Sequence, residues 1–266
     1  MTIQVAPDAR RVPGAATGGA GVVVTGAARG LGKGIAEVLA AHGWNVVGVD
    51  LAPSVEETIG SLGEGHAAVV GDVCDATVIE QAAVRAAELG DGVGAAVFNA
   101  GVTAPGDTVG YDLAAWDKVL DVNLRGVFVG AQTVRPHLSA GGSMVMLSSI
   151  CASQGFAARA SYCASKAGVD GLVRSLAQEW GASGVRVNAV APGTIETEMQ
   201  QAMLASGRAS TAGYLDRVPL GRIGRPHEIG EAVAYLVSPH ASYVSGVVLP
   251  VDGGWAGGGL PAVAPS

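Results

Sequence analysis

Short apolar runs that alternate with longer helical stretches constrain this chain more than any other feature. Runs such as Val22-Val23-Val24 and Val145-Met146-Leu147 are typical of strands buried on both faces of a sheet, and all are too short to cross a bilayer. Because helical stretches separate these runs, the pattern predicts an α/β fold, with a parallel sheet covered by helices on both faces. The 266 residues suffice for one large domain and are too few for two independent ones.

The periodicity also predicts where the elements begin and end. Strands are expected near residues 21–26, 45–50, 66–70, 94–98, 143–149, 185–191 and 246–251, and helices near 31–42, 55–62, 77–89, 112–139, 161–183 and 226–238. Residues 1–20 are expected to form a flexible arm, residues 21–256 the domain and residues 257–266 a tail. The longest irregular segment, about 193–219, has the length of a substrate lid.

Composition narrows the possible partners and compartments. The net charge is −7 with no basic block, so nucleic acid is not an expected partner. The first twenty residues lack the apolar stretch of a signal peptide, and we expect a cytoplasmic protein with no membrane partner. The three cysteines form no C-x-x-C pair and are expected to be reduced. The five histidines have no metal-ligand spacing, so no metal is expected.

A glycine-rich turn joins the first expected strand to the first expected helix. It reads Thr25-Gly26-Ala27-Ala28-Arg29-Gly30-Leu31-Gly32. Bare glycine backbone lets a pyrophosphate approach, and the positive end of the following helix favours its charge. In a chain with 41 glycines such a turn is weak evidence by itself. Its place between a strand and a helix nevertheless predicts a dinucleotide site rather than a structural turn.

Two acidic residues follow the next two strands. Asp50 ends the second strand, 20 residues after Gly30, where a carboxylate can accept hydrogen bonds from the adenosine ribose hydroxyls. Its alternative role is that of a surface carboxylate capping the next turn. Asp72, followed by Val73, comes after the third strand and is placed to reach the adenine.

Tyr162 and Lys166 lie four residues apart in a helical stretch and therefore project from one face. An ammonium beside a phenol stabilises the phenolate, so we expect the pKa of Tyr162 to fall from about 10 towards the working pH. Tyr162 can then act as a general base towards an alcohol and a general acid towards a ketone. The same spacing is common on helices, where it mostly marks an amphipathic surface pair.

Two further residues give this pair a context. Ser149 closes the fifth expected strand, 13 residues before Tyr162, and ligands of open α/β sheets bind beyond the carboxyl ends of strands. Asn123 lies in the middle of the expected helix 112–139. Its poor helix propensity there indicates a special role, such as holding a water molecule.

Together these motifs resemble the short-chain dehydrogenase/reductase family over roughly residues 20–255. The matching residues are Thr25-Gly26 through Gly32, Asn99-Ala100-Gly101, Asn123, Ser149, Tyr162 with Lys166, Pro192-Gly193 and Val251-Asp252-Gly253-Gly254. The resemblance implies a Rossmann-type fold with strand order 3-2-1-4-5-6-7. This chain departs at Phe98, where the family has a further asparagine. The departure affects one sheet-stabilising hydrogen bond and not the chemistry.

The resemblance also implies a role for each matched position. Tyr162 is implied to be the acid/base, Lys166 to bind the nicotinamide ribose and lower the tyrosine pKa, and Ser149 to hydrogen-bond the reacting oxygen. Asn123 is implied to hold a water that links Lys166 to solvent. Thr197 is implied to hold the nicotinamide carboxamide, with help from the backbone of Ile195. The other implied cofactor-binding residues are Gly26, Arg29, Gly30, Leu31, Gly32, Asp50, Asp72, Val73, Asn99, Ala100, Gly101, Pro192 and Gly193.

The expected cofactor is NAD. The carboxylate of Asp50 would repel the 2′-phosphate of NADP, and no basic residue follows it in Leu51-Ala52-Pro53. Arg29 argues weakly the other way, because NADP-using relatives often carry a basic residue just before this glycine. Its alternative roles are a solvated charge or a bridge to Asp50.

The substrate side of the site is the part that the sequence determines least. Arg159 lies three residues before Tyr162 and has two interpretations. In the first interpretation, Arg159 binds an anionic substrate, as an arginine at this position does in the hydroxypropyl-coenzyme M dehydrogenase branch of the family. In the second, it is a solvated surface charge. Either an adaptable apolar lid or the ordinary packing of a short helix pair is expected from Met199, Met203, Leu204 and Tyr214. Ser149 and Tyr162 complete the expected substrate contacts.

The leading interpretation is an NAD-dependent oxidoreductase that interconverts a secondary alcohol and a ketone. One alternative is a 3-oxoacyl-thioester reductase using NAD(P)H, which Asp50 disfavours. A second alternative is a non-catalytic NAD-binding sensor. The presence of Asn123, Ser149, Tyr162 and Lys166 together argues against it. The resemblance further implies a homotetramer formed through the helices near 112–139 and 161–183.

Overall fold

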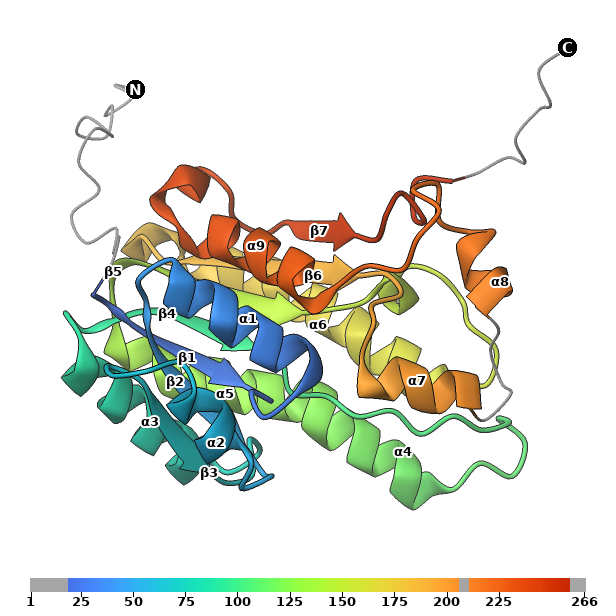
Figure 1. Cartoon of the computed structure of the whole chain (residues 1–266), viewed down its shortest axis with the longest axis horizontal. Helices are drawn as coiled ribbons and strands as arrows, with labels where there is room; N and C mark the ends of the chain where they lie inside the picture. The colour runs from blue at the N-terminus through green and yellow to red at the C-terminus, as the bar shows by residue number, and fades with distance from the viewer. Residues whose placement is uncertain (1–18, 206–210, 259–266) are drawn as a thin grey trace, which may run out of the picture.

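The computed structural model describes residues 19–205 and 211–258, and these contain seven parallel strands in one sheet. The strands are β1 (Gly21–Thr25), β2 (Asn45–Asp50), β3 (Ala67–Val70), β4 (Val93–Phe98), β5 (Leu138–Leu147), β6 (Arg186–Pro192) and β7 (Val248–Val251). Their order in the sheet is β3-β2-β1-β4-β5-β6-β7 (Figure 1). The predicted Rossmann-type fold and strand order are therefore confirmed.

Helices cover both faces of the sheet. On one face lie α1 (Gly30–Ala41), α2 (Val55–Gly60) and α9 (Pro226–Val237), and on the other α3 (Ala76–Leu89), α5 (Gly126–Val134) and α6 (Ala160–Trp180). In Figure 1, α1 and α9 lie side by side in front of the sheet. Side chains of β1 alternate between the two cores: Val22 and Val24 join the core under α1 and α9, and Val23 joins the other. This burial on both faces explains the continuous apolar runs.

The expected helix over residues 112–139 is interrupted by a turn of π-helix. After α4 (Leu113–Leu120) the chain makes a π turn at Asp121–Arg125 and continues as α5. The N–H of Gly126 donates to the carbonyl of Asp121, which is the i to i−5 bond of a π turn. Asn123 lies inside this turn with none of its surface exposed. The residue that was out of place in a regular helix therefore sits at the irregularity.

The segment expected to be an irregular substrate loop contains two short helices. They are α7 (Glu198–Ala205) and α8 (Thr211–Leu215). Residues 206–210 between them lie outside the described residues, and so do 1–18 and 259–266, which make up most of the expected arm and tail. The structure therefore describes this segment as two helical pieces that join β6 to α9.

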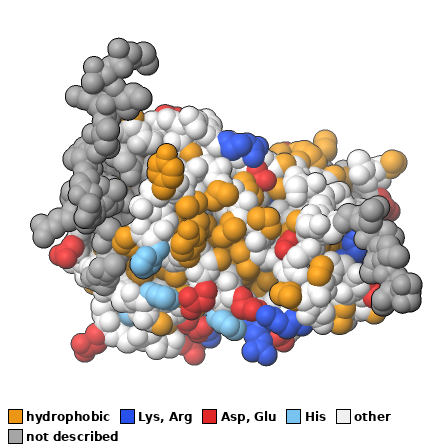
Figure 2. Space-filling view, turned by 90° about the horizontal axis from the view of Figure 1, so that it is seen from above, with side chains coloured by type: hydrophobic (Ala, Val, Ile, Leu, Met, Phe, Trp, Pro, Cys, Tyr) orange, Lys and Arg blue, Asp and Glu red, His pale blue; other side chains and the backbone are white. Residues whose placement is uncertain are grey.

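Figure 2 shows the face on the side of α9 and β7, where hydrophobic side chains gather beside acidic and histidine side chains. Tyr235 of α9 and Val247 before β7 are 45% and 36% exposed. As the last strand in the sheet order, β7 has one edge without a partner strand in the described chain. Within the described ranges, no helix combines the length and apolar character that a membrane crossing requires.

Candidate active site

The carboxyl ends of neighbouring strands gather the predicted motifs at one edge of the sheet. Gly26 follows β1, Asn99 follows β4, Ser149 lies just after β5, and Gly193 follows β6. Because β1, β4, β5 and β6 are parallel neighbours, these four positions lie along the same edge. Ligands of open α/β sheets bind at this edge. Segments that are far apart in the sequence therefore meet where the chemistry was predicted.

The turn between β1 and α1 depends on its glycines. Gly26 and Gly30 adopt φ values of +68° and +56°, a region that side chains disfavour. A Cβ on Gly32 would lie 1.9 Å from the carbonyl oxygen of Gly26, so this helix turn cannot carry a side chain there. The chain thus presents bare backbone at the start of α1, with Leu31 as the second residue of the helix.

The N-terminus of α1 differs from those of two other helices. Asp75 caps α3 and Asp112 caps α4, each accepting a backbone N–H with its side chain. By contrast, the N-cap of α1, Arg29, makes no capping hydrogen bond, and no acidic residue lies in the first turn. The first N–H groups of a helix need a partner and favour an anion. This end of α1 suits a pyrophosphate.

Asp50 ties the end of β2 to the glycine-rich turn. One carboxylate oxygen accepts the N–H of Ala28 at 3.0 Å, and the other accepts the N–H of Ala52 at 2.9 Å. Each oxygen keeps a further lone pair for a ribose hydroxyl. Arg29 is exposed and forms no ion pair with Asp50 among the described contacts, so the bridge considered from the sequence is not present.

The other residues expected near the adenine follow β3. The carboxylate of Asp72 is exposed and accepts the N–H of Cys74 at 2.9 Å. Val73 is 9% exposed and belongs to the core that α3 and α5 cover. Only the backbone of Val73 and the side chain of Asp72 therefore remain available to a ligand.

Asn99 fastens the end of β4 to the end of β1. Its side-chain amide donates to the carbonyls of Thr25 and Gly26 at 3.0 and 3.1 Å. In return, the Thr25 hydroxyl accepts the N–H groups of Asn99 and Ala100 at 3.0 and 3.2 Å. Gly101 continues this stretch, which therefore lies directly against the glycine-rich turn.

Phe98, where the chain departs from the family pattern, fills the core instead of making a polar contact. The side chain is 2% exposed and lies against α5. A Cβ on Gly130 would come within 2.5 Å of the Phe98 ring, so a glycine on α5 leaves the space that the larger residue occupies.

Asn123 holds the loop that leaves β4. Its side chain makes two bonds with the backbone of Val102, accepting the N–H at 2.8 Å and donating to the carbonyl at 2.9 Å. The amide also donates to the Ser165 hydroxyl at 3.1 Å, which joins this loop to α6 one residue before Lys166. The special role predicted for Asn123 thus includes a structural part that the sequence did not reveal.

Tyr162 and Lys166 project from one face of α6, as their spacing predicts. The Lys166 ammonium lies 5.7 Å from the centre of the Tyr162 ring and donates to the carbonyl of Leu147 at 2.6 Å. Lys166 is 3% exposed, and burial lowers its pKa to about 8. The side chain therefore places a costly buried charge beside the end of β5.

The pKa of Tyr162 moves opposite to the expectation from sequence. Burial raises the pKa of Tyr162 to about 12, and a hydrogen bond with the Ser149 side chain and the charge of Arg159 only partly oppose this rise. The predicted lowering is thus wrong for the polypeptide by itself. The reason is that burying a phenolate outweighs the positive charge nearby. Ser149, 8% exposed, also accepts the N–H of Cys151 at 3.1 Å.

Hydrogen bonds join the loop after β4 to the start of α6. The Tyr111 hydroxyl donates to the carbonyl of Ala104 and lies 3.0 Å from the Ser161 hydroxyl. The N–H of Gly106 donates to the carbonyl of Ala158 at 3.0 Å. Ala158 has a φ of 59° and is the one non-glycine residue with positive φ in the described ranges. Strain of this kind often accompanies functional sites, and this residue directly precedes Arg159.

Arg159 begins α6 at the N-cap position, three residues before Tyr162. Its side chain is partly buried and has no hydrogen bond or ion pair with the described residues. Its positive charge lowers the pKa of both Tyr162 and Cys151, against the larger effect of burial in each case. The structure thus brings Arg159 to the candidate site, where an anion can use it.

The two ends of the substrate segment meet in a short neck. The N–H of Gly224 donates to Thr194 and the N–H of Glu196 donates to Gly224, at 3.0 and 2.9 Å. A Cβ on Gly224 would lie 2.6 Å from the end of the Ile195 side chain, so a larger residue here would have to displace it. Thr197, just beyond the neck, accepts the N–H of Gln200 at 3.3 Å in the first turn of α7.

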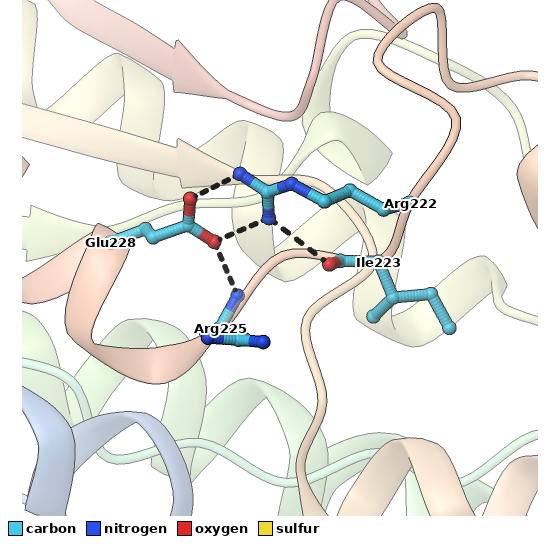
Figure 3. Close-up of polar contacts among 4 residues, drawn as sticks. All are labelled: Arg222, Ile223, Arg225 and Glu228. Atoms are coloured by element: carbon cyan, nitrogen blue, oxygen red, sulfur yellow. Dashed lines mark hydrogen bonds and ion pairs between the residues drawn. The ribbon is translucent and has the colours of Figure 1, made fainter.

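Figure 3 shows the contacts that fix residues 222–225, the returning segment of this neck. Both carboxylate oxygens of Glu228 receive the Arg222 guanidinium, at 2.6 and 2.8 Å, and one also accepts the N–H of Arg225 at 2.8 Å. The guanidinium further donates to the carbonyl of Ile223. These bonds from Arg222 and Arg225 lower the pKa of Glu228 to about 2. The carboxylate is therefore ionised at any working pH.

A small apolar cluster fixes the far end of the segment. Ile150, Val218 and Trp255 form its buried centre, and Phe156 and Tyr214 pack around them. The cluster joins the turn after Ser149 to α8 and to the residues that follow β7. Of the residues expected in the lid, Tyr214 is placed by this cluster. The side chain of Met199 lies outside the described residues.

Comparisons with known proteins agree with this geometry. A family model described as enoyl-(acyl carrier protein) reductase matches residues 26–256. Cis-4-hydroxycyclohexanecarboxylate dehydrogenase of Sinomonas cyclohexanicum is 41% identical over 239 residues, covering 88% of this chain and 95% of the relative. The 3-oxoacyl-[acyl-carrier-protein] reductase FabG of Vibrio cholerae is 37% identical over 235 residues, covering 87% of this chain and 95% of the relative.

A solved structure repeats the fold. It belongs to a candidate NAD(P)-dependent gluconate 5-dehydrogenase from Beutenbergia cavernae, with NADP bound at low occupancy. Its TM-score is 0.85 at 36% identity, and the match covers 92% of this chain and 100% of that chain. The similarity thus extends from the glycine-rich turn to the residues after β7. The family model and the relatives named here are all described as dehydrogenases or reductases. The chain therefore belongs to the short-chain dehydrogenase/reductase family and is an oxidoreductase.

Proposed function

We propose that this protein is an NAD-dependent oxidoreductase that interconverts a secondary alcohol and a ketone. The observation that supports this proposal most is that Tyr162 lies beside the buried ammonium of Lys166 and close enough to Ser149 for the Ser149 side chain to lower its pKa. A hydroxyl that donates to a reacting oxygen, next to a group that gives or takes a proton, is what this interconversion needs.

The residues present fit a nicotinamide dinucleotide. The uncapped start of α1, with Gly26 and Gly30, would hold the pyrophosphate, and Asp50 would accept the adenosine ribose hydroxyls. Asp72 and the backbone of Val73 would border the adenine, and Thr197 and Ile195 the nicotinamide carboxamide. When bound, the dinucleotide supplies or accepts the hydride. NAD rather than NADP is proposed because of the carboxylate of Asp50.

In ketone reduction, Tyr162 donates the proton of its hydroxyl to the carbonyl oxygen while Ser149 donates a second hydrogen bond to the same oxygen. In alcohol oxidation, the Tyr162 phenolate takes the hydroxyl proton. Since burial raises the pKa of Tyr162 to about 12, the phenolate needs the positive charges of Lys166 and Arg159. Asn123 would place a water that links Lys166 to solvent, in addition to holding the loop after β4.

The proposed substrate is a secondary alcohol that also carries a carboxylate. The partly buried guanidinium of Arg159 lies near Tyr162 and has no partner among the described residues, which supports this choice because guanidinium groups bind carboxylates in a two-pronged geometry. The name of the relative from Sinomonas cyclohexanicum also supports it, since that substrate carries a hydroxyl and a carboxylate on one ring. Met199 of α7 is proposed as a further substrate contact.

A second candidate is reduction of a 3-oxoacyl thioester. It is favoured by the 37% identity with FabG of Vibrio cholerae over nearly the whole domain. A thioester substrate has no carboxylate beside the reacting carbon, so this function would leave Arg159 without a role. Asp50 also disfavours the phosphorylated coenzyme.

A substrate screen tests these proposals directly. Cyclic and acyclic hydroxy acids, with the methyl ester of each, are offered with NAD and with NADP, and turnover is followed at the NADH absorbance. Acetoacetyl thioesters are offered with NADH and NADPH in the reverse direction. We expect turnover of hydroxy acids with NAD, and a weaker reaction with the esters. Turnover of thioesters alone would select the second candidate, and NAD binding without turnover would indicate a sensor.

Variants locate the carboxylate site within the same screen. Arg159→Met should raise KM for a hydroxy acid about tenfold or more and leave KM for the ester unchanged, because a charged hydrogen bond contributes about 1.5–3 kcal/mol. Arg85→Met, an exposed arginine on α3, is the matched control. An equal rise in KM for the acid and for the ester would show that Arg159 does not bind the substrate carboxylate.

We also propose a homotetramer assembled through α4, α5 and α6. Leu113 of α4 and Phe128 of α5 are 73% and 43% exposed, and burying them would favour such a contact. Light scattering should give four chains at micromolar concentration. A stable monomer would contradict the assembly.

A further inference from the structure

Two polar side chains of α6 form hydrogen bonds with consecutive residues at the end of β5. Lys166 donates to the carbonyl of Leu147 at 2.6 Å. One helical turn later, Asp170 accepts the hydroxyl of Ser148 at 2.5 Å. Ser148 is 3% exposed, and the next residue is Ser149. The spacing of Lys166 and Asp170 repeats that of Tyr162 and Lys166, so three functional groups lie along one face of α6.

The titratable groups that act on Lys166 come from two elements. Cys151, in the turn after β5, carries a thiol whose pKa is raised by burial. On α6, Tyr162 lies one turn before Lys166 and Asp170 one turn after. Gly101 and Asn123 of the neighbouring loop and π turn also lie close and are uncharged. Asp170 is therefore the carboxylate among the groups that act on this buried ammonium.

Asp170 is itself partly buried. Burial raises its pKa, while the hydrogen bond from Ser148 and the charges of Arg174 and Lys166 act in the opposite direction. Burying a carboxylate is unfavourable unless it has a partner. The partners here are the hydroxyl of Ser148, which is next to Ser149, and the ammonium of Lys166, which is beside Tyr162. The contacts that compensate the burial of Asp170 are therefore made with groups at the candidate active site.

We propose that Asp170 is a positioning residue for the site, stabilising the Lys166 ammonium through its charge and fixing the turn that carries Ser149 through its bond to Ser148. This proposal rests on the function proposed above, because it assigns Asp170 to act through Lys166 and Ser149. In this role Asp170 itself contacts neither substrate nor coenzyme. The charge and the hydrogen bond are separable, and each has its own variant.

Asp170→Asn keeps an oxygen that can accept from Ser148 and removes the charge. Ser148→Ala keeps the charge and removes the hydrogen bond. Asp117→Asn is the matched control, since Asp117 is an exposed residue of α4 whose side chain makes no described hydrogen bond or ion pair. Circular dichroism and thermal midpoints compare the folding of all four proteins.

The titration of Lys166 reads the effect of the charge without any turnover. The chain has three lysines, Lys33, Lys118 and Lys166, and the first two are exposed. Labelling lysine with carbon-13 at Cε therefore gives three signals, two of which serve as internal standards. We expect Asp170→Asn to lower the pKa of Lys166 by about one unit, and Ser148→Ala and Asp117→Asn to leave it unchanged.

Turnover reads the effect of the hydrogen bond. Ser148→Ala should lower kcat about tenfold with little change in KM for the coenzyme, because displaced catalytic groups cost rate more than binding. Asp170→Asn should lower kcat and also move the alkaline limb of the rate profile to lower pH, since Lys166 then loses its proton earlier. Asp117→Asn should match the unmodified protein in both readouts.

Two results would overturn the proposal: an unchanged Lys166 titration in Asp170→Asn, or wild-type kcat in Ser148→Ala. If Asp170→Asn fails to fold, the Ser148→Ala rate decides the outcome. If the substrate screen finds no reaction at all, the proposed function fails. The lysine titration still decides whether Asp170 stabilises the ammonium, so the two failures are distinguishable.

Discussion

The two walls of the candidate site are built in opposite ways. On the sheet side, Asn123, Ser149 and Lys166 are 0%, 8% and 3% exposed, and each hydrogen-bonds to backbone. The described part of the segment between Thr197 and Val218 instead contains two short helices, and the neck and the apolar cluster described above fix its two ends.

This difference assigns the chemistry to the sheet side of the site and the substrate specificity to the loop side. The buried wall leaves each catalytic group one position, so it can serve any substrate that presents a hydroxyl or carbonyl there. The loop wall lies outside the sheet, and surface segments of this kind tolerate change more readily than the scaffold that carries them. We therefore expect changes on the sheet side to affect rate and stability strongly, and changes at the loop to affect mainly substrate binding.

The largest effect is expected from Tyr162→Phe on the sheet side. Losing the hydroxyl removes proton transfer, which typically contributes about 10²–10⁴-fold, so turnover should fall roughly a thousandfold while NADH binding survives. Steady-state kinetics and fluorescence titration of NADH measure the two quantities. Tyr235→Phe, at an exposed tyrosine of α9, is the control. Near-normal turnover in the Tyr162 variant would remove the mechanism.

Lys166→Met tests the cost of the buried wall. The unfolded chain holds the lysine proton up to its usual pKa of 10.5, whereas the folded protein releases it at about 8. The unfolded state therefore binds more protons between these values, and the free energy of unfolding rises with pH across this window. A shift of this size corresponds to about 3 kcal/mol, which Lys166→Met should remove from the pH dependence.

Thermal midpoints between pH 7 and 10.5, measured without coenzyme, show this difference. Lys118→Met, at an exposed lysine of α4, should keep the wild-type slope. Parallel curves for the wild type and Lys166→Met would contradict the lowered pKa of Lys166.

Asp50→Ser should change coenzyme preference by several-fold to about thirtyfold. At about 4 Å and an effective dielectric near 20, like charges repel by about 4 kcal/mol, and a quarter to a half of this gives that discrimination. The variant should raise kcat/KM for NADP and lower it for NAD, with Arg29 free to help. Asp72→Ser should affect both coenzymes alike. If the wild type already uses NADP as well as NAD, the coenzyme assignment is wrong.

The smallest effect is expected at the neck of the loop. Glu228→Gln weakens the bonds to Arg222, and exposed ion pairs contribute at most about 1 kcal/mol. We expect KM for substrate to rise up to about fivefold while kcat stays within about twofold. Glu88→Gln, which breaks an exposed pair on α3, should change neither. A larger loss of kcat than of binding would show that the neck also positions the catalytic wall.

Local sequence pattern was enough to predict the fold. Most strands and helices lie within a few residues of their expected bounds, since apolar periodicity reflects burial directly. The exception is β5, which begins at Leu138, inside the expected helix 112–139 and five residues before the expected start of the strand. The π turn at Asn123 was not predictable, although the poor helix propensity of this residue marked the place. Asp170 was also missed, but its four-residue spacing from Lys166 was a usable signal.

The chain by itself determined the layered α/β fold, the glycine turn and the alignment of Tyr162 with Lys166, because these depend on residues close together in sequence. Only the tertiary structure decided that the pKa of Tyr162 rises, that Lys166 bonds to Leu147, and that Ser148 meets Asp170. Burial and contacts between distant segments set these properties. Neither exists until the sheet and helices have packed, which is why no local pattern contained them.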